Sequence, residues 1–265
     1  MSQYSKLQQQ LLNTNKDIYE VFMSDNTTVQ SADFVLQVER GKVPGVTSVN
    51  IQGYNSAMPA AWRPAWELAD TTAWNYPASA VTMSFTSGST ETLTMVVSGL
   101  DINYAIKTAT VTFTASTTGV VTVGDANFFR INRMQITSGT SVGRIVATNN
   151  GTTYSCINAG TGISQSSTYT VPAGYTFYLN RVNAYTTNNG TQYCSYRIYT
   201  QRISGGVTTP QIVLTAPFTQ FYSTLRVVPR AYVEKTDIQW QLFQSNPAPG
   251  SIQLEGILVS NSLPI

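Results

Sequence analysis

Acid–base chemistry in this chain would have to rest on carboxylates, because the sequence contains no histidine. Without imidazole, the chain cannot build a Ser-His-Asp or Cys-His nucleophile or a histidine-ligated zinc site. Two opposed carboxylates, as in a glycosidase, are the arrangement that remains. Asp101 with Asp125, or Glu234 with Asp237, could provide it, but none of them lies in a recognisable motif. We therefore expect a protein that is not an enzyme, with no catalytic residue, metal site or cofactor.

Arginine has an uneven distribution along the chain. Between Asp125 and Glu234 there is no carboxylate and no lysine. A guanidinium group suits planar hydrogen-bonded contacts to backbone carbonyls or to carboxylates of another chain. We therefore interpret the arginines of this interval as candidate subunit-interface residues: Arg130, Arg133, Arg144, Arg181, Arg197, Arg202, Arg226 and Arg230.

Two arrangements of these arginines remain open. They could be scattered, with their guanidinium groups in water or bonded to loop carbonyls of the same chain. If they cluster instead, their complement should be acidic. It would lie on a partner protein or on the Asp101, Asp125, Glu234 or Asp237 of a symmetry mate.

The low charge of the chain limits its partners. Only 11% of the 265 residues are charged, and the net charge is +2. Nucleic-acid binding needs clustered Lys and Arg, and a membrane span needs about 18 apolar residues in a row, so we expect neither partner. The first residues, MSQYSKLQQQLL, lack the regions of a secretion signal, which indicates assembly in a cytoplasm. Cys156 and Cys194 are too few for a disulfide framework; a bridge between them is left open but not indicated.

Residues 3–23 are the one helix that the sequence predicts. They contain no Gly or Pro, and their apolar side chains have a heptad-like spacing: Tyr4, Leu7, Leu11, Ile18 and Val21. A helix this short is marginal alone in water, so it needs a partner. We interpret the five residues as a partner-docking arm, which binds symmetry mates or another protein; packing on its own domain is the alternative.

From Val35 onward, runs of Val, Ile, Thr, Tyr and Phe between Gly, Pro and Asn predict strands and turns, with no second helix. Residues 108–114 and 237–242 alternate between apolar and polar side chains, so each run should be a strand with one buried face. The apolar phase changes between Ile131 and Met134, which predicts a β-bulge. Asn-Gly pairs at 150–151 and 189–190 predict type I′ hairpins, and residues 172–174 predict a turn with Gly174 at positive φ.

These patterns predict an all-β protein, a jelly-roll-like antiparallel β-sandwich with a short N-terminal helix or arm. We divide it into a helical arm at 1–33, a strand-poor segment with the first strands at 34–100, and the sandwich at 101–265. The segment carries Trp62, Trp66 and Trp74, which pack in the core or anchor the arm or a subunit contact.

Several stretches, taken in order, resemble the accessory virion structural proteins of tailed bacteriophages, particularly those of cyanobacterial and other aquatic hosts. They are RGKVPG at 40–45 with SVN at 48–50, residues 66–77, VSGLD at 97–101, FRINR at 129–133, YTVPAG at 169–174 with Tyr178 and Leu179, EKTDI at 234–238 and GILV at 256–259. The first 34 residues are outside the resemblance. It implies a β-sandwich or jelly-roll subunit, often trimeric, and no enzymatic residues.

The resemblance and the composition together favour a capsid cement or decoration protein, or another accessory subunit at the neck or tail. Such a subunit would form a homotrimer, bind the major capsid protein or other virion proteins, and belong to the virion after assembly in the bacterial cytoplasm. The alternative is a tail-fibre or baseplate protein that binds a host surface polysaccharide through aromatic side chains such as Tyr193, Tyr196 and Tyr199.

We predict that deletion of residues 1–24 weakens attachment to the particle and leaves the sandwich folded, because the heptad residues of the arm would bind a partner. Co-sedimentation with particles measures the attachment, and far-UV circular dichroism measures the fold. Loss of the β-sheet signal after the deletion would contradict the docking role and would mean that the helix belongs to the core.

Overall fold

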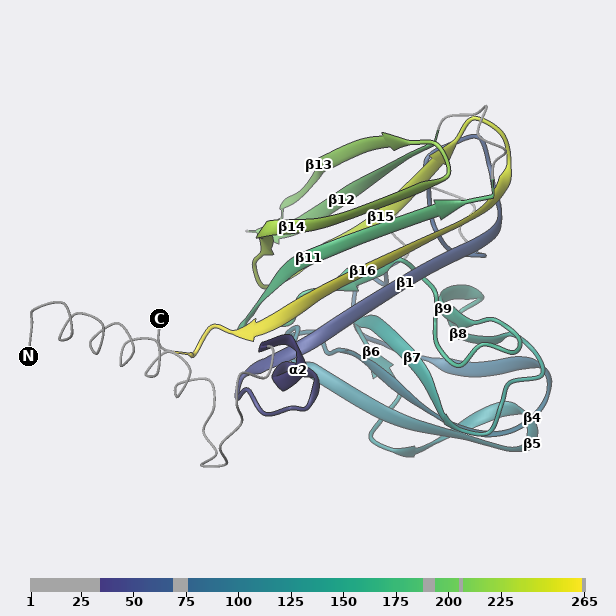
Figure 1. The fold of residues 1–265 in the computed structure, drawn as a ribbon. Helices are drawn as coiled ribbons and strands as arrows, with labels where there is room; N and C mark the ends of the chain where they lie inside the picture. Colours follow the sequence, from purple (N-terminus) through teal and green to yellow (C-terminus); the bar gives the residue numbers. More distant parts are fainter. Residues whose placement is uncertain (1–33, 69–75, 188–193, 205–206, 264–265) are drawn as a thin grey trace, which may run out of the picture.

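The computed structural model describes residues 34–68, 76–187, 194–204 and 207–263. Antiparallel strands dominate this part of the chain, and they form two lobes that lie one above the other in Figure 1. The all-β fold is therefore confirmed. Among the described residues there is no helix with the length and apolar character that crossing a bilayer requires.

The upper lobe is an eight-stranded jelly roll. Its strands are β1 (Val46–Met58), β10 (Thr168–Thr170), β11 (Tyr175–Thr186), β12 (Cys194–Ser204), β13 (Val207–Phe218), β14 (Phe221–Tyr232), β15 (Thr236–Gln244) and β16 (Ala248–Ser260). One sheet, here sheet A, has the order β1-β16-β11-β14; the other, sheet B, has the order β10-β15-β12-β13. In this order the first strand of the lobe, β1, pairs with its last, β16, and the second, β10, pairs with the last but one, β15. This nested pairing is the jelly-roll arrangement. The predicted sandwich type is thus confirmed.

The core of the jelly roll lies between sheets A and B. Phe177, Leu179 and Leu254 of sheet A are fully buried, as are Tyr196 and Trp240 of sheet B. Each comes from a strand in which inward side chains alternate with outward ones, for example along β16. Because both inner faces are apolar, burial drives the two sheets together. The short β2 (Arg63–Pro64) extends sheet B by pairing with β15.

The lower lobe is inserted between the first and second strands of the jelly roll. It contains β3 (Val81–Thr82), β4 (Ser84–Leu100), β5 (Ile106–Val123), β6 (Asn127–Phe128), β7 (Arg130–Ser138), β8 (Ile145–Asn149) and β9 (Thr152–Ile157). The long β4 pairs with β5, β7 and β8, and β3 pairs with β6. A separate apolar core, which includes Phe85, Met95, Phe113 and Met134, holds this lobe together.

The predicted division of the chain differs from this arrangement. The strand-poor segment at 34–100 contains the 13-residue β1, which is the first strand of the jelly roll. The boundary between residues 100 and 101 falls inside the β4–β5 hairpin of the inserted lobe. Residues 101–265 therefore do not form one sandwich. Alternation identifies which residues share a face of a strand, but not which strand will be the neighbour.

One element was missed, a helix after residue 33. Helix α2 (Phe34–Glu39) precedes β1, and Gly41, two residues after its end, has φ +66°. Gly41 N–H donates to the Val38 carbonyl and Lys42 N–H to the Gln37 carbonyl, the pattern of a Schellman cap. Val38 packs against apolar residues on the outer face of β16, so the helix covers one end of sheet A (Figure 1).

The local turn and bulge predictions are confirmed where the structure describes them. Asn150 and Gly151 have φ values of 47° and 79°, as the β8–β9 hairpin requires, and Gly174 also has positive φ. On β7, Arg133 pairs with Ser98 and Ile131 pairs with Gly99, so Asn132 is the extra residue of a bulge. The Asn189-Gly190 turn lies outside the described residues.

The prediction of one buried face holds for β5 but not for β15. Ala109, Val111 and Phe113 of β5 are buried, as predicted. On β15, the apolar residues 238, 240 and 242 are buried, but the polar side chains of 237, 239 and 241 are buried too. The prediction of a single buried face was therefore wrong for β15. On this second face, Asp237 contacts Arg130 of the inserted lobe and Phe243 packs against Trp62.

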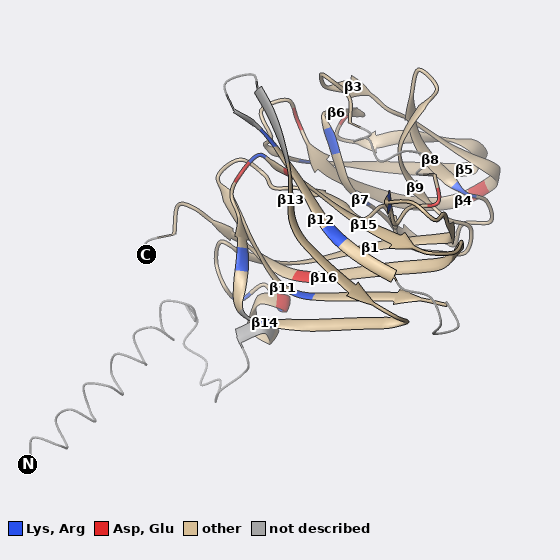
Figure 2. Cartoon of the chain, turned by 90° about the horizontal axis from the view of Figure 1, so that it is seen from above, with Lys and Arg blue, Asp and Glu red and all other residues tan. Residues whose placement is uncertain are grey.

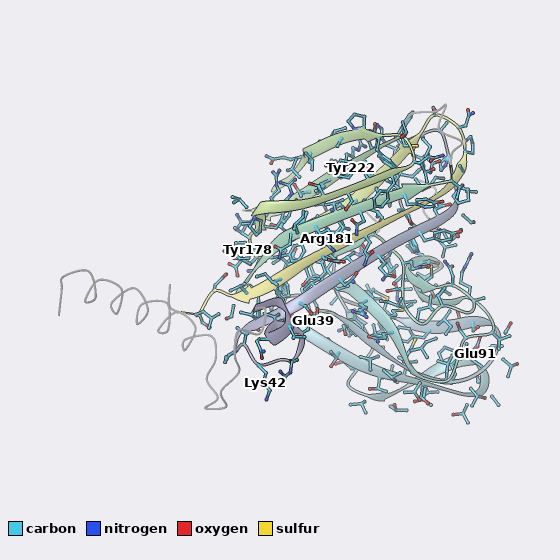
Figure 3. The ribbon with its side chains drawn as sticks, in the orientation of Figure 1. Glu39, Lys42, Glu91, Tyr178, Arg181 and Tyr222 are labelled. Carbon is cyan, nitrogen blue, oxygen red and sulfur yellow. The ribbon has the colours of Figure 1, made fainter. Side chains whose placement is uncertain are left out.

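Glu91 holds the outer end of the inserted lobe, where Figure 3 labels it. Its carboxylate accepts hydrogen bonds from the N–H groups of Val142 and Gly143 and from the hydroxyl of Ser87, at 2.7–2.9 Å. Burial by itself raises the pKa of the carboxyl, but these three donors lower it more, so the pKa of Glu91 lies below its ordinary value of 4.5. The charged form therefore stabilises the loop that joins β7 to β8.

We expect Glu91→Gln to lower stability at pH 7 and to reduce the loss of stability in acid. A carboxyl with a lowered pKa in the folded state stabilises above its unfolded value of about 4.5, and this contribution disappears as the pH falls through the folded value. Urea unfolding from pH 7 to pH 3, followed by circular dichroism, measures both effects. Equal differences between variant and wild type at every pH would contradict the prediction.

Candidate functional site

A buried ion pair joins the two lobes. Nε and one terminal nitrogen of Arg130 on β7 donate to the two carboxylate oxygens of Asp237 on β15, at 3.0 and 3.1 Å. Both side chains are at most 3% exposed. The Thr170 hydroxyl and the Gln201 amide also donate to Asp237, at 2.6 and 3.2 Å. A buried ion pair is stable when further hydrogen bonds satisfy its remaining polar atoms, as the Thr170 and Gln201 donors do here.

Aromatic rings surround the guanidinium group of Arg130. Its central carbon lies 3.8 Å from the ring centre of Phe129 and 4.2 Å from that of Tyr76, and a terminal nitrogen donates to the Phe129 carbonyl at 3.0 Å. Burial and the nearby charge of Asp237 raise the pKa of Tyr76, so its hydroxyl stays protonated at neutral pH. The arrangement excludes water and is typical of a structural joint.

Further contacts complete the joint. The Asn132 side chain exchanges two hydrogen bonds of 2.9 Å with the backbone of Thr170 on β10. The Trp66 indole N–H donates to the sulfur of Cys156 at 2.9 Å. Because each bond connects the jelly roll, or the chain leading from it, to the inserted lobe, the lobes are held in one orientation.

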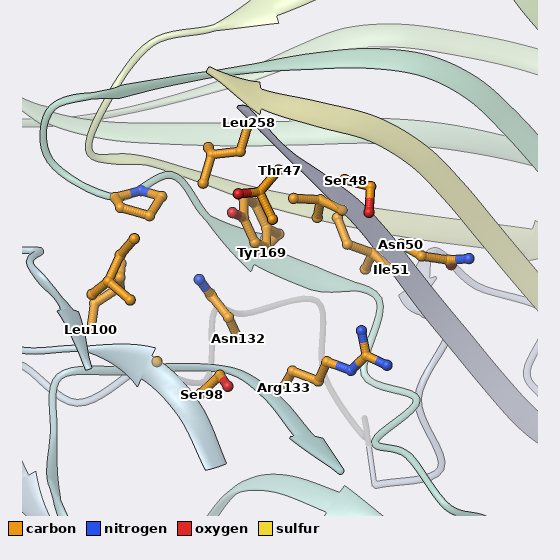
Figure 4. Close-up of a pocket in the computed structure, with 14 residues that line it drawn as sticks. Thr47, Ser48, Asn50, Ile51, Ser98, Leu100, Asn132, Arg133, Tyr169 and Leu258 are labelled. Carbon is orange, nitrogen blue, oxygen red and sulfur yellow. The ribbon is translucent and has the colours of Figure 1, made fainter. Parts of the chain in front are cut away.

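A cavity of about 260 Å³ lies beside this joint (Figure 4). Its upper wall comes from β1, with Thr47, Ser48 and Asn50, and its lower wall from β4 and β7, with Ser98 and Arg133. In Figure 4, Arg133 extends from β7 toward the side where Asn50 and Ile51 lie. The Nε atom of Arg133 is buried and has no hydrogen-bond partner among the described residues. Burial lowers the pKa of this arginine.

The other predicted arginines contact their own chain or solvent. Arg197 donates to Gln241 at 2.7 Å and stacks on Trp62, and Arg144 donates to Asn158 at 3.1 Å. Arg230 donates to the Val213 carbonyl at 2.9 Å. Arg202 is exposed, and Arg226 is partly buried, with its Nε atom enclosed and unpartnered among the described residues.

The eight arginines therefore do not form one cluster. Figure 2 shows charged residues spread over both lobes. Arg181 on β11 faces Glu255 of β16 at 3.4 Å on the half-exposed outer face of sheet A. Of the acidic residues expected as complements from a symmetry mate, Asp237 instead pairs with Arg130 of the same chain and Asp125 with Lys107.

The carboxylates considered for catalysis serve the backbone or these ion pairs. Asp101 accepts hydrogen bonds from the N–H groups of Asn103 and Ala105. Glu234 accepts one from Gly174 N–H at 2.6 Å, at the turn before β11. Within the described part of the chain, no three His, Cys, Asp or Glu side chains gather where a metal ion could bind.

An apolar patch covers part of the outer face of sheet A. Tyr185 on β11 lies opposite Phe221 on β14. Leu225 lies two outward positions further along β14, beyond Ser223, whose hydroxyl donates to the Asn183 side-chain oxygen at 2.7 Å. The side chains of Tyr185, Phe221 and Leu225 are 49%, 62% and 66% exposed, respectively. We call these three residues the sheet A patch. Arg181 lies opposite Leu225 and borders it; Figure 3 shows Arg181 on this sheet.

The remaining predicted residues have different outcomes. The arm residues Tyr4, Leu7, Leu11, Ile18 and Val21 lie outside the described residues, as does Trp74. Trp66 is buried at the joint, and Trp62 is partly exposed beside Arg197. Cys156 and Cys194 are both buried thiols, and no disulfide joins them.

Sequence reasoning missed the main role of Asp237. The residue was considered as an outward polar position of a strand and as half of a carboxylate pair. The signal that could have identified it is its place directly beside a buried apolar run, together with the scarcity of acids near so many arginines.

Comparisons with known proteins give no assignment. No family model matches the chain, and no curated protein matches it. The chain is similar to a solved structure described as "Structure of infectious bursal disease virus Gt strain", with 11% identity over 91% of this chain and 76% of that chain. The TM-score is 0.22. A score this low indicates neither a shared fold nor a shared function.

We expect Asp237→Asn to lower the free energy of unfolding by about 3–5 kcal/mol, because it leaves Arg130 buried without its counter-charge. Urea unfolding followed by tryptophan fluorescence measures the change. Replacing both partners, Arg130→Met with Asp237→Leu, should recover much of the loss. The control Asp125→Asn removes an exposed ion pair and should leave the midpoint nearly unchanged. Similar midpoints for the two single variants would show that the buried pair does not hold the lobes together.

Proposed function

We propose that this chain is a non-enzymatic structural subunit of a virus particle, which assembles with further copies of itself into a homotrimer. Its place would be that of an accessory subunit of a tailed phage, a capsid cement or decoration protein or a subunit at the neck or tail. The resemblance of its sequence stretches and its low charge support this proposal. Jelly rolls occur in viral capsid and lectin domains, among others, so the fold is compatible with it but does not carry it.

The sheet A patch is the observation that carries the proposal. Tyr185, Phe221 and Leu225 are 49% to 66% exposed, and they lie on the same face of two neighbouring strands. Removing such side chains from water is favourable by about 25 cal/mol per Å² of apolar surface. Exposed aromatic and aliphatic side chains on one face of a sheet, here on either side of the polar Asn183–Ser223 pair, are typical of a contact with another protein.

A second copy of this chain is the occupant that the surroundings of the patch favour. The border of the patch carries both charges, Arg181 and Glu255, on the same face. A surface that contains both signs side by side can be complementary to itself when a symmetry axis passes near it. Each added copy would bury more of this apolar surface, and the contact would not require a partner protein of opposite net charge.

The edge of sheet A favours a closed oligomer over an open fibre. Among the described strands, β14 ends the sheet and pairs with β11 alone. Leu179 pairs with Arg230 and Arg181 with Leu225, so residues 226–229 of β14 form a bulge, which contains Pro229. Bulges and prolines on edge strands hinder the unlimited addition of strands. Copies of the chain can still contact one another through the outer face of sheet A, in a closed ring around a symmetry axis.

We expect the full chain to be a trimer, and we expect Leu225→Glu to raise the dissociation constant of this trimer by about 30-fold or more, because it places a charge in the apolar contact. Native mass spectrometry and light scattering across a dilution series measure the oligomer. Circular dichroism checks that the variant is folded.

Val120→Glu is the matched control. Val120 is 64% exposed, close to the 66% of Leu225, but it lies on β5 of the inserted lobe. The control should leave the oligomer unchanged. A chain that is monomeric at every concentration, or equal weakening by both variants, would overturn the proposed assembly and would favour the host-polysaccharide alternative.

A further inference from the structure

Arg133 lines the interlobe cavity and has no ionic partner among the described residues. The neighbouring polar residues of β7 already bind the jelly roll. Arg130 pairs with Asp237, and both polar atoms of the Asn132 amide are hydrogen-bonded to the Thr170 backbone. The β7 bulge at Asn132 directs both Asn132 and Arg133 to the cavity. Among the described residues, no carboxylate pairs with Arg133, and its buried Nε atom has no acceptor. A partly desolvated guanidinium is an unfavourable group until an anion binds it.

The wall opposite Arg133 supplies hydrogen-bonding groups. Thr47 and Ser48 of β1 and Ser98 of β4 line the cavity, and within the described residues their hydroxyls have no side-chain hydrogen-bond partner. Strand β1 also ends sheet A, and its Gln52 carbonyl accepts from Ser167 N–H on the free edge at 3.0 Å. In an antiparallel strand, alternate residues direct their backbone groups to the same edge. Ser48 and Asn50 therefore present their backbone N–H and carbonyl groups to the cavity as well.

The rest of the lining is apolar. Leu100, Pro172 and Leu258 contribute aliphatic surface from three separate strands or turns, and the Tyr169 ring lies among them. The cavity thus combines one cation, several hydroxyl and backbone hydrogen-bonding groups, and an apolar wall. These are the complements of a carboxylate, of sugar hydroxyls and of the C–H face of a sugar ring.

We propose that the interlobe cavity binds a single acidic sugar residue of the uronic acid class, with Arg133 holding the carboxylate and the β1 edge with Ser98 holding the hydroxyls. A cavity of about 260 Å³ has room for one monosaccharide. The proposal is independent of the trimer, because the cavity is built by one chain and none of the residues of the sheet A patch lines it.

The charge of the cavity argues against a nucleotide as its ligand. A nucleotide would bring several negative charges to a wall that has one arginine. One carboxylate matches one guanidinium.

Isothermal titration of the full-length chain with sodium glucuronate tests the proposal. We expect saturable binding to wild type, and a loss of affinity of about 10- to 100-fold in Arg133→Gln, since hydrogen bonds to a charged group are removed. Thr47→Val, which removes a hydroxyl at nearly constant volume, should weaken binding by a smaller factor. Arg144→Gln is the matched control, because Arg144 is exposed and does not line the cavity, and it should bind as wild type does.

Three further probes separate the sources of binding. Glucose lacks the carboxylate, acetate lacks the hydroxyls, and a short Asp-containing peptide offers the carboxylate on an extended backbone. All three should bind more weakly than glucuronate. Equal binding of acetate, tighter binding of the peptide, or unchanged affinity in Arg133→Gln with intact circular dichroism would overturn the acidic-sugar assignment. None of these outcomes changes with the oligomeric state, which the Leu225→Glu variant measures separately.

Discussion

The buried pair of Arg130 and Asp237 is the interaction on which the two-lobed structure depends. Removing both charges from water is costly, and the cost is offset only because the carboxylate receives bonds from the guanidinium, a hydroxyl and an amide at once. Those donors come from β7 of the inserted lobe and from β10 and β12 of the jelly roll. Any rotation of one lobe against the other would separate these groups and leave charges unpaired in a dry environment. The joint is therefore a rigid one, and the adjacent cavity keeps its shape with it.

The jelly roll tolerates a large insertion because the chain leaves and returns at one place. The insertion follows β1, and the segment that re-enters before β10 is bonded back to β1 through Ser167 and Gln52. An insertion whose ends lie close together does not disturb the pairing of the host sheets. The eight jelly-roll strands keep their order around it, and each lobe retains a core of its own. The insertion also provides the second wall of the cavity, which the jelly roll alone would lack.

Scarce charges have different uses in the interior and on the surface. In the interior, Arg130 and Asp237 provide orientation, and Glu91 closes a loop through backbone N–H groups. On the surface, neutral polar side chains and a few apolar ones remain, among them the sheet A patch. A surface with few charges repels other copies weakly, so apolar contacts between copies meet little electrostatic opposition. This property links the composition to the proposed assembly.

The sequence alone was sufficient for the local features. Strand alternation on β5, the positive φ values at Asn150 and Gly151, and the bulge between Ile131 and Met134 follow from steric and burial rules that act within a few residues. Sequence patterns also predicted an all-β jelly roll. They did not predict helix α2, the insertion, the second buried face of β15 or the partner of Arg130. Each of these depends on contacts between residues far apart in the chain: Arg130 and Asp237 are 107 positions apart. Local periodicity records which face of a strand is apolar, but only the packed structure decides which distant surface covers it, and so which charges become partners and which, like Arg133, are left for a ligand.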